Sequence, residues 1–451
     1  MTTPLPVSLC SLDDWVRSTD DHASHRLPIL ERAGQLLAGR DVASAEERQD
    51  LAEKLERWRY QHLNEHRGEL PVRDQVLLDA LDLAANELAG RAHRPPRAIR
   101  AALHDASLDT GTVGEALELL ESALTTEELA RRATDVTEEH FGVATADGSR
   151  QRRMLMYAPL YLSNECVNHC LYCGFRHPLQ IPRQHLNLAE ALVETEVLLD
   201  RGFRHVLLVA GDFPAHLTTE YYSEIIAALA QRGVNPSIEI APQSTASYAR
   251  MVNAGACGLT LYQETYDETL YSRYHVRGPK SSYAWRLEGM DRAAEAGMPW
   301  LSFGFLLGLG DPREEIRALM RHAKYIQERF PGRTLAFGLP RIHNAPETFH
   351  VPYPVDDDLF VRLYCTLRIA FPQAELVLST REIASMRARL AKTCITQISA
   401  GSSTAPGGYA KASDAAGEQF HKSDHRSASE VAQWLTENGF AVIWNLTGCR
   451  K

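Results

Sequence analysis

The chain has 451 residues, 44% of them hydrophobic, and a formal net charge of -10. The length predicts two or three domains unless one of them is a barrel, and the acidic balance argues against a nucleic-acid partner. No apolar run approaches the roughly 20 residues that cross a bilayer, and the polar residues 1–5 lack the regions of a secretory signal, so we expect a cytoplasmic protein without a membrane partner.

Residues 1–150 are rich in Ala, Leu, Glu and Arg with helical spacing. In residues 74–88, for example, apolar residues recur at intervals of three and four, which is typical of an amphipathic helix. We therefore expect an α-helical N-terminal region or cap over residues 1–150.

From about residue 154, short apolar runs alternate with amphipathic helical segments, which is the pattern of βα units around a parallel sheet. Eight strands each followed by a helix predict an α/β fold, a (β/α)8 TIM-type barrel over residues 151–410. A six-strand partial barrel is the alternative, and residues 411–451 are expected to close the barrel with a loop and a helix. The eight expected strands are residues 154–162, 206–210, 237–241, 259–263, 301–307, 335–339, 376–379 and 395–398.

Three cysteines, Cys166, Cys170 and Cys173, follow the first expected strand with the spacing C-x-x-x-C-x-x-C. They can hold three irons of one [4Fe-4S] cluster, and because such clusters are normally fixed by four thiolates, one iron is left for an external ligand. The alternative is a zinc site or incidental thiols, although a structural zinc needs four ligands. The remaining cysteines are scattered singly and do not indicate a disulfide framework; they are Cys10, Cys257, Cys365, Cys394 and Cys449.

Polar residues collect at the ends of the expected strands. Catalytic residues of such barrels lie at the C-terminal strand ends and in the loops that follow. One face of the barrel should therefore combine the cysteine loop with two acids, two arginines and several hydroxyls. The residues at these positions are Asp212, Glu264, Arg341, Arg381 and Ser399.

These motifs together resemble the aromatic amino acid lyase branch of the radical S-adenosylmethionine (SAM) superfamily. Known members cleave tyrosine in thiamine biosynthesis and in [FeFe]-hydrogenase maturation, and tryptophan in nosiheptide biosynthesis. The resemblance covers residues from about 154 to the end and implies a [4Fe-4S] cluster and SAM as cofactors. The motifs that carry it are the cysteine loop and residues 262–266, 278–287, 340–341, 378–382 and 399–409.

The resemblance also implies roles in SAM binding. Asp212 receives the SAM ammonium, Glu264 contacts the ribose and Arg286 the carboxylate, while the backbone near Tyr172 and Phe175 meets the adenine. Each polar residue has a structural alternative. Asp212 could instead cap a helix, Glu264 and Arg286 could form a mutual ion pair, and Arg286 could simply pack in an amphipathic helix.

Substrate binding is implied for the last two strands. Arg381 and Ser399 match positions that hold the carboxylate and amine region of the amino acid, and a guanidinium with a hydroxyl suits a zwitterion. Arg341 is a second candidate. The alternative for Arg381 is a surface salt bridge with Glu382 or with a neighbouring helix.

The function implied is a carbon–carbon lyase that uses a 5'-deoxyadenosyl radical to abstract hydrogen from the amino group of a free aromatic amino acid. L-Tyrosine is the expected substrate, with p-cresol and dehydroglycine (2-iminoacetate) as products. Because the C-terminal tail contains only Cys449, a second iron-sulfur cluster of the hydrogenase-maturation kind is disfavoured.

Two other functions stay open. One is a radical SAM enzyme that acts on tryptophan or rearranges another small molecule in a natural-product pathway. The other is a non-catalytic iron-sulfur sensor with the helical region as a docking module. If the chain is a radical SAM enzyme, it also needs an electron donor such as flavodoxin or ferredoxin.

Overall fold

The computed structural model describes residues 23–65, 72–90, 97–144, 150–343, 345–346, 348–410 and 417–446. Cys10 and Cys449 lie outside these residues. The chain divides into two compact units, residues 1–99 and residues 100–451. Within the described ranges, no helix has the length and apolar character that crossing a membrane requires.

The first unit is helical, as the sequence predicts. Its described helices are α2 (Ala23–Leu37), α3 (Ala45–Glu65) and α4 (Val72–Leu88). Their apolar faces share one core that includes Leu55, Trp58 and Leu81. Beside this core, the guanidinium of Arg97 is buried and lies 2.9 Å from a carboxylate oxygen of Glu56.

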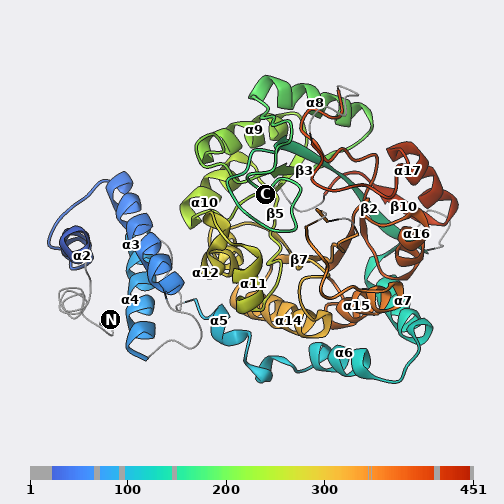
Figure 1. Cartoon of the computed structure of the whole chain (residues 1–451), viewed down its shortest axis with the longest axis horizontal. Helices are drawn as coiled ribbons and strands as arrows, with labels where there is room; N and C mark the ends of the chain where they lie inside the picture. Colours follow the sequence, from blue (N-terminus) through green and yellow to red (C-terminus); the bar gives the residue numbers. More distant parts are fainter. Residues whose placement is uncertain are drawn as a thin grey trace. The chain divides into compact units, whose positions relative to one another are not determined.

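The second unit contains a closed barrel of eight parallel strands (Figure 1). Each strand pairs with the next along the chain, and the first and last strands pair in the register Leu155↔Gln397, which closes the barrel. The expected (β/α)8 barrel is therefore confirmed, and the six-strand alternative is wrong. The strands are β2 (Arg150–Ser163), β3 (His205–Ala210), β4 (Asn235–Glu239), β5 (Gly258–Thr260), β6 (Trp300–Gly304), β7 (Thr334–Gly338), β8 (Glu375–Leu378) and β9 (Gln397–Ser399).

Helices surround the barrel (Figure 1). Several begin at a side-chain cap that satisfies free backbone N–H groups, such as the capping box of Asn187 and Glu190. The helices between the strands are α8 (Leu188–Asp200), α9 (Thr219–Gln231), α10 (Thr245–Ala254), α11 (Glu268–Tyr274), α12 (Tyr283–Leu287), α13 (Gly289–Glu295), α14 (Pro312–Arg329), α15 (Asp357–Ala370) and α16 (Ala384–Thr393), with the short 3-10 helix η2 (Pro279–Ser281).

Further elements lie against the outside and the N-terminal end of the barrel. Arg362 on α15 donates to the carbonyls of Leu120 and Leu124 and so fixes the loop after α6. β1 and β10 extend the sheet at the start of β2. These elements are α5 (Ile99–Ala102), η1 (Ala106–Leu108), α6 (Thr112–Glu121), α7 (Thr126–Phe141), β1 (Gly142–Ala144), α17 (Ala428–Glu437) and β10 (Phe440–Ile443).

Residues 417–426 run across the C-terminal end of the barrel. The Gln419 N–H donates to the Thr404 carbonyl (3.2 Å), and the Ser423 N–H donates to the Thr380 carbonyl (2.9 Å). The Tyr161 hydroxyl donates to the side-chain oxygen of Gln419 (2.6 Å). This segment therefore covers the strand ends where the sequence places the functional residues.

Candidate functional site

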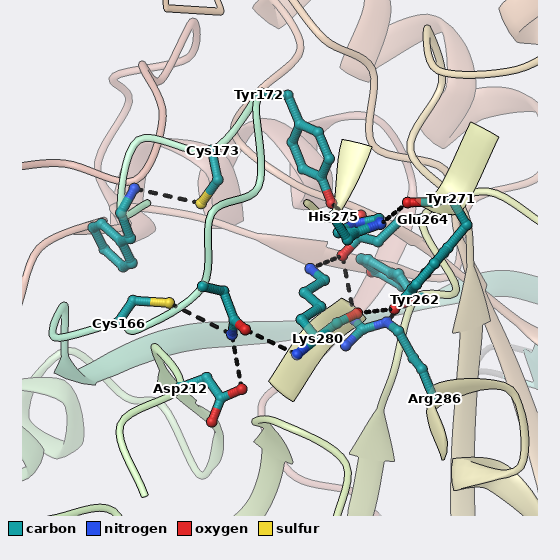
Figure 2. Close-up of polar contacts among 12 residues, drawn as sticks. Cys166, Tyr172, Cys173, Asp212, Tyr262, Glu264, Tyr271, His275, Lys280 and Arg286 are labelled. Atoms are coloured by element: carbon teal, nitrogen blue, oxygen red, sulfur yellow. Dashed lines mark hydrogen bonds and ion pairs between the residues drawn. The ribbon is translucent and has the colours of Figure 1, made fainter. Parts of the chain in front are cut away.

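The cysteine loop leaves β2 at Ser163 and lies over the C-terminal end of the barrel. All three thiols are free; Cys170 is buried, whereas Cys166 and Cys173 are partly exposed. Cys166 and Cys173 project from one continuous loop above Asp212 and Lys280 (Figure 2). The Phe175 N–H also donates to Cys173 Sγ (3.4 Å), so part of the loop's backbone turns toward the sulfur atoms.

Asn168 holds this loop in place. Its Nδ2 donates to Asp212 Oδ2 (2.7 Å) and also lies 3.8 Å from Cys166 Sγ, while its Oδ1 accepts the Lys280 N–H (2.8 Å). Asn168 was not predicted from the sequence as a site residue. Its place between two cysteines is the only signal, and side-chain partners cannot be inferred from position alone.

Glycines allow the loop to approach the barrel closely. A Cβ on Gly211, directly after β3, would clash with the Glu165 carbonyl oxygen, and a Cβ on Gly278 would clash with Asn168 Oδ1. Close backbone approach of this kind is a usual reason for glycine. The loop position therefore depends on both glycines.

The donors fit an iron-sulfur cluster. Three thiols on one loop are the soft ligands that iron-sulfur clusters take. Burial raises the pKa of the Cys170 thiol to about 12 and also raises the pKa of Cys173, so these sulfurs need bound metal charge to ionise. Among the described residues, no group of three or more His, Cys, Asp or Glu side chains is arranged to hold a single metal ion.

Beside the loop lies a group of buried charges (Figure 2). Glu264 Oε1 is 2.7 Å from Lys280 Nζ and 3.2 Å from Arg286 Nη2. Burial acts to raise the pKa of Glu264, but the two cations outweigh it and lower the pKa to about 2. The carboxylate is therefore ionised at neutral pH, and the group carries one net positive charge.

Glu264 also has an unusual backbone. Its φ of 73° makes it the one non-glycine residue with positive φ in the part of the chain that the structure describes. Such a conformation costs of order 1–3 kcal/mol and often marks a functional site. The strain turns the chain just after β5, where the Leu306 N–H donates to the Glu264 carbonyl (2.9 Å).

Asp212 and Arg286 line one pocket together with Lys280 and Trp285. Burial raises the pKa of Asp212, although its hydrogen bond with Asn168 acts in the opposite direction. The helix-cap alternative for Asp212 is wrong, since the residue that caps α9 is Thr218. The ion-pair alternative for Glu264 and Arg286 does describe the structure as it stands.

The two aromatic residues of the loop differ in their surroundings. The Tyr172 hydroxyl hydrogen-bonds His275 Nε2 (2.8 Å), and the Tyr172 ring lies 5.8 Å from Lys280 Nζ. Phe175 is buried and packs edge-on against Tyr161, with 6.0 Å between ring centroids. The Phe175 side chain therefore anchors the loop in the barrel interior.

A second cavity lies inside the barrel, under residues 417–426. Arg381, which follows β8, and Ser399, the last residue of β9, both line it. Glu382 pairs with Arg341 (2.5 Å) and His343 (2.7 Å), so the expected alternative of an Arg381–Glu382 salt bridge is wrong.

Arg381 has no ion pair with any described residue, and its guanidinium lies 3.6 Å from the centre of the Phe420 ring. Arg341, the second candidate, is held by Glu382 and also by Asp357 (2.8 Å). Arg381 is therefore the better placed of the two arginines to bind an anion in the cavity.

Glu239, at the end of β4, faces the same cavity and was not singled out from the sequence. Its carboxylate has no hydrogen bond or ion pair with a described residue. Burial raises its pKa to about 7, while Arg381 acts to lower it. Inward-facing residues alternate along a barrel strand, and this alternation in residues 237–241 was the available signal. The other cavity residues include Tyr157, Tyr161, Tyr262 and Phe420.

Most of the chain from residue 160 onward is similar to known proteins. Residues 160–323 match the radical SAM superfamily, and residues 339–441 match the biotin and thiamin synthesis associated domain. The 2-iminoacetate synthase of Escherichia coli (strain K12) is 34% identical over 319 residues, which are 70% of this chain and 82% of that protein. The chain belongs to the radical SAM aromatic amino acid lyase family.

Solved structures agree with this family. The [FeFe]-hydrogenase maturase HydG is 31% identical, with a TM-score of 0.66 over 78% of this chain and 80% of that chain. Methylornithine synthase, at 22% identity and a TM-score of 0.58 over 77% of this chain and 97% of that chain, shows the fold. Radical SAM enzymes of this family use a [4Fe-4S] cluster and SAM, which confirms the cofactors expected from the sequence.

Proposed function

We propose that this radical SAM lyase acts on a free aromatic amino acid, L-tyrosine, and breaks its Cα–Cβ bond to give dehydroglycine (2-iminoacetate) and p-cresol. The observation that carries the proposal is the cavity that Arg381 and Glu239 both line, neither of them in an ion pair with a residue that the structure describes. The cation suits the carboxylate of an amino acid, and the acidic side chain can accept a hydrogen bond from a polar aromatic ring in this tyrosine-lined cavity.

Cys166, Cys170 and Cys173 would hold the cluster, and the pocket beside them would hold SAM. Asp212 receives the ammonium of SAM, and Arg286 receives the carboxylate. The net positive charge of the Glu264 group supports this orientation, since a carboxylate would neutralise it. Glu264 is assigned to the ribose, and the backbone near Tyr172 and Phe175 to the adenine.

The amino acid would lie with its carboxylate on Arg381 and its amino group near Ser399. Ser399 is 1% exposed, so a hydrogen bond formed there is shielded from water. Glu239 would accept a hydrogen bond from the phenol hydroxyl. A buried group that needs such a partner discriminates strongly against an analogue without it, so Glu239 would select tyrosine over phenylalanine.

When bound, the cluster and SAM supply a 5'-deoxyadenosyl radical, which removes one hydrogen atom from the substrate amino group. The residues of the chain fix which hydrogen faces that radical, because small displacements change reaction outcomes. Loss of the Cα–Cβ bond leaves dehydroglycine and a phenol-derived fragment. That fragment becomes p-cresol after it takes up one electron and one proton.

We also propose a division of labour along the chain. Residues 151–410 form the catalytic barrel. Within the expected closing region 411–451, the described residues 417–426 cover its mouth, whereas β10 pairs with the start of β2 at the opposite end. The support is that Gln419 hydrogen-bonds Tyr161, and Phe420 stacks on Arg381. Closure of this kind excludes water from a radical site. The N-terminal helical region is assigned no catalytic role.

Tryptophan in a natural-product pathway is the second candidate substrate, since an indole N–H could also donate to Glu239. Anaerobically reconstituted protein with dithionite, SAM and each of tyrosine, tryptophan and phenylalanine, followed by mass spectrometry, tests both. p-Cresol with tyrosine supports the proposal. Deoxyadenosine that increases with none of the three would reject the substrate class, and no SAM cleavage at all would favour the iron-sulfur sensor.

A further inference from the structure

On one side, the cysteine loop lies against the residues that end α11 and follow it. Cys170 pairs in antiparallel fashion with His275, and the Leu171 N–H donates to the Tyr274 carbonyl (3.1 Å). Side chains alternate between the two faces of such a pair. Cys170 (4% exposed) and His275 (1%) therefore face inward, whereas Leu171 (39%) and Val276 (61%) face solvent.

The two outward residues are large, apolar and adjacent to a cluster ligand. Only six large hydrophobic residues of the described chain are strongly exposed, and two of them lie here, on the two segments that the bridge joins. Scattered apolar residues are ordinary on a surface, whereas apolar residues that gather beside a functional group mark an interaction site. Leu171 and Val276 therefore form the apolar centre of a candidate docking surface.

Basic residues flank this centre. Arg273, at the end of α11, and Arg277 are both exposed, and neither forms an ion pair with a described residue. His169, whose backbone N–H donates to the Arg277 carbonyl, packs edge-on against His177, with 5.1 Å between the ring centroids. The acids of α11 are at its opposite end, where Asp267 caps the helix and Glu268 pairs with Arg100 (2.5 Å). The surface is thus locally basic on a chain with a net charge of -10.

We propose that Leu171, Val276, Arg273 and Arg277 form the docking surface for an acidic one-electron carrier protein, such as a flavodoxin or ferredoxin. The carrier would give up one electron and the cluster would gain it, with no proton transferred. This inference rests on the proposed function, because reductive SAM cleavage consumes that electron. Weak redox encounters use small interfaces, and charge complementarity increases their association rate.

A charge reversal tests this surface directly. The variant R273E/R277E is compared with the wild-type protein and with R232E/R250E, which reverses two exposed arginines that pair with Glu196 and Glu220 elsewhere on the unit. Two readouts are measured on cluster-loaded protein: the Kd for a purified bacterial flavodoxin, and deoxyadenosine formation driven either by reduced flavodoxin or by dithionite.

We expect R273E/R277E to weaken flavodoxin binding by at least about tenfold at low salt, because the loss concerns the charges that steer association. Dithionite-driven SAM cleavage should stay within about twofold of wild type, and R232E/R250E should match wild type with both reductants. Unchanged flavodoxin binding, or equal losses in both double variants, would overturn the docking surface.

The two proposals fail differently. If the wild-type protein does not cleave SAM with dithionite, the proposed function is wrong, and the binding measurement still tests the surface. An equal loss of dithionite-driven and flavodoxin-driven activity in R273E/R277E would mean that the arginines support the cluster itself, which also overturns the docking role. A second variant, V276S, should weaken flavodoxin binding without changing charge.

Discussion

Glu264 and Lys280 form a buried ion pair of 2.7 Å directly beside the loop that carries the three cysteines. Arg286 shares the same carboxylate oxygen at 3.2 Å. The backbone of Glu264 is also strained, with a φ of 73°. The arrangement leaves one unbalanced positive charge next to the pocket assigned to SAM. Glu264 holds Lys280 and Arg286 together in this position.

Replacing Glu264 by Gln should destabilise the protein. Two buried cations would lose their shared anion, and breaking a buried pair from one side costs about 3 kcal/mol. The free energy of unfolding in urea measures the loss. E220Q is the matched control, because Glu220 pairs with Arg250 on the exposed surface and should cost less than about 1 kcal/mol. Equal stability of the two variants would contradict the assigned role of Glu264.

Replacing Gly211 by Ala should prevent cluster assembly. The added Cβ would meet the Glu165 carbonyl next to Cys166 and force the cysteine loop away from the barrel. Iron and sulfide content after anaerobic reconstitution should drop to less than about half of the wild-type value, since backbone cannot yield as a flexible side chain does. G233A is the control: its Cβ meets no atom within 4 Å, and although alanine is strained at its φ of 80°, that strain lies between α9 and β4 and not in the cysteine loop, so its cluster content should be normal. A normal cluster in G211A would show that the loop tolerates displacement.

Replacing Arg381 by Lys should reduce kcat/KM for tyrosine by roughly 100-fold, because a lysine cannot reproduce the two-pronged contact of a guanidinium with a carboxylate. Cluster content should be unaffected, since Arg381 lies in the cavity and not in the loop. Steady-state kinetics and iron analysis check both statements. R389K, on the surface beside Glu127, should behave as wild type. Unchanged turnover in R381K would place the substrate carboxylate elsewhere.

The affinity for tyrosine should depend on pH through Glu239. Its raised pKa of about 7 means that the ionised form, the stronger acceptor for a phenol hydroxyl, is gained as pH rises through 7. KM for tyrosine should therefore fall by roughly threefold to tenfold between pH 6 and pH 8. The E239Q variant should lose this dependence and discriminate less against phenylalanine. A wild-type profile that stays in E239Q would assign the titration to another group.

Much of the fold could be predicted because its signals are local. The eight apolar runs separated by amphipathic segments correspond one by one to β2–β9, and closure follows from their number. The arrangement of residues 100–141 could not be predicted from the sequence. α6 and α7 pack on α15 through contacts such as that of Arg362 with Leu120. Such contacts join residues more than 200 positions apart, which periodicity does not report.

Some features of the candidate site could be predicted from the sequence, and others could not. Motifs identified the cysteines and the positions of Asp212, Glu264, Arg286, Arg381 and Ser399, since each belongs to a short contiguous pattern. The ion-pair partners of these residues could not be predicted, because pairing depends on where the side chains lie in three dimensions. Glu382 pairs with Arg341 and His343, and Lys280 joins Glu264, although no sequence spacing distinguishes these pairings from others. The roles of the five motif residues stay predictions until the variants are measured.

The most direct test of the account combines anaerobic reconstitution with product analysis. Cluster-loaded protein is reduced with dithionite in the presence of SAM and L-tyrosine, and deoxyadenosine, p-cresol and the glyoxylate formed by hydrolysis of dehydroglycine are quantified. The account predicts that p-cresol and glyoxylate appear in equal amounts and only when SAM and tyrosine are both present. Deoxyadenosine without p-cresol, or p-cresol that forms without SAM, would contradict it.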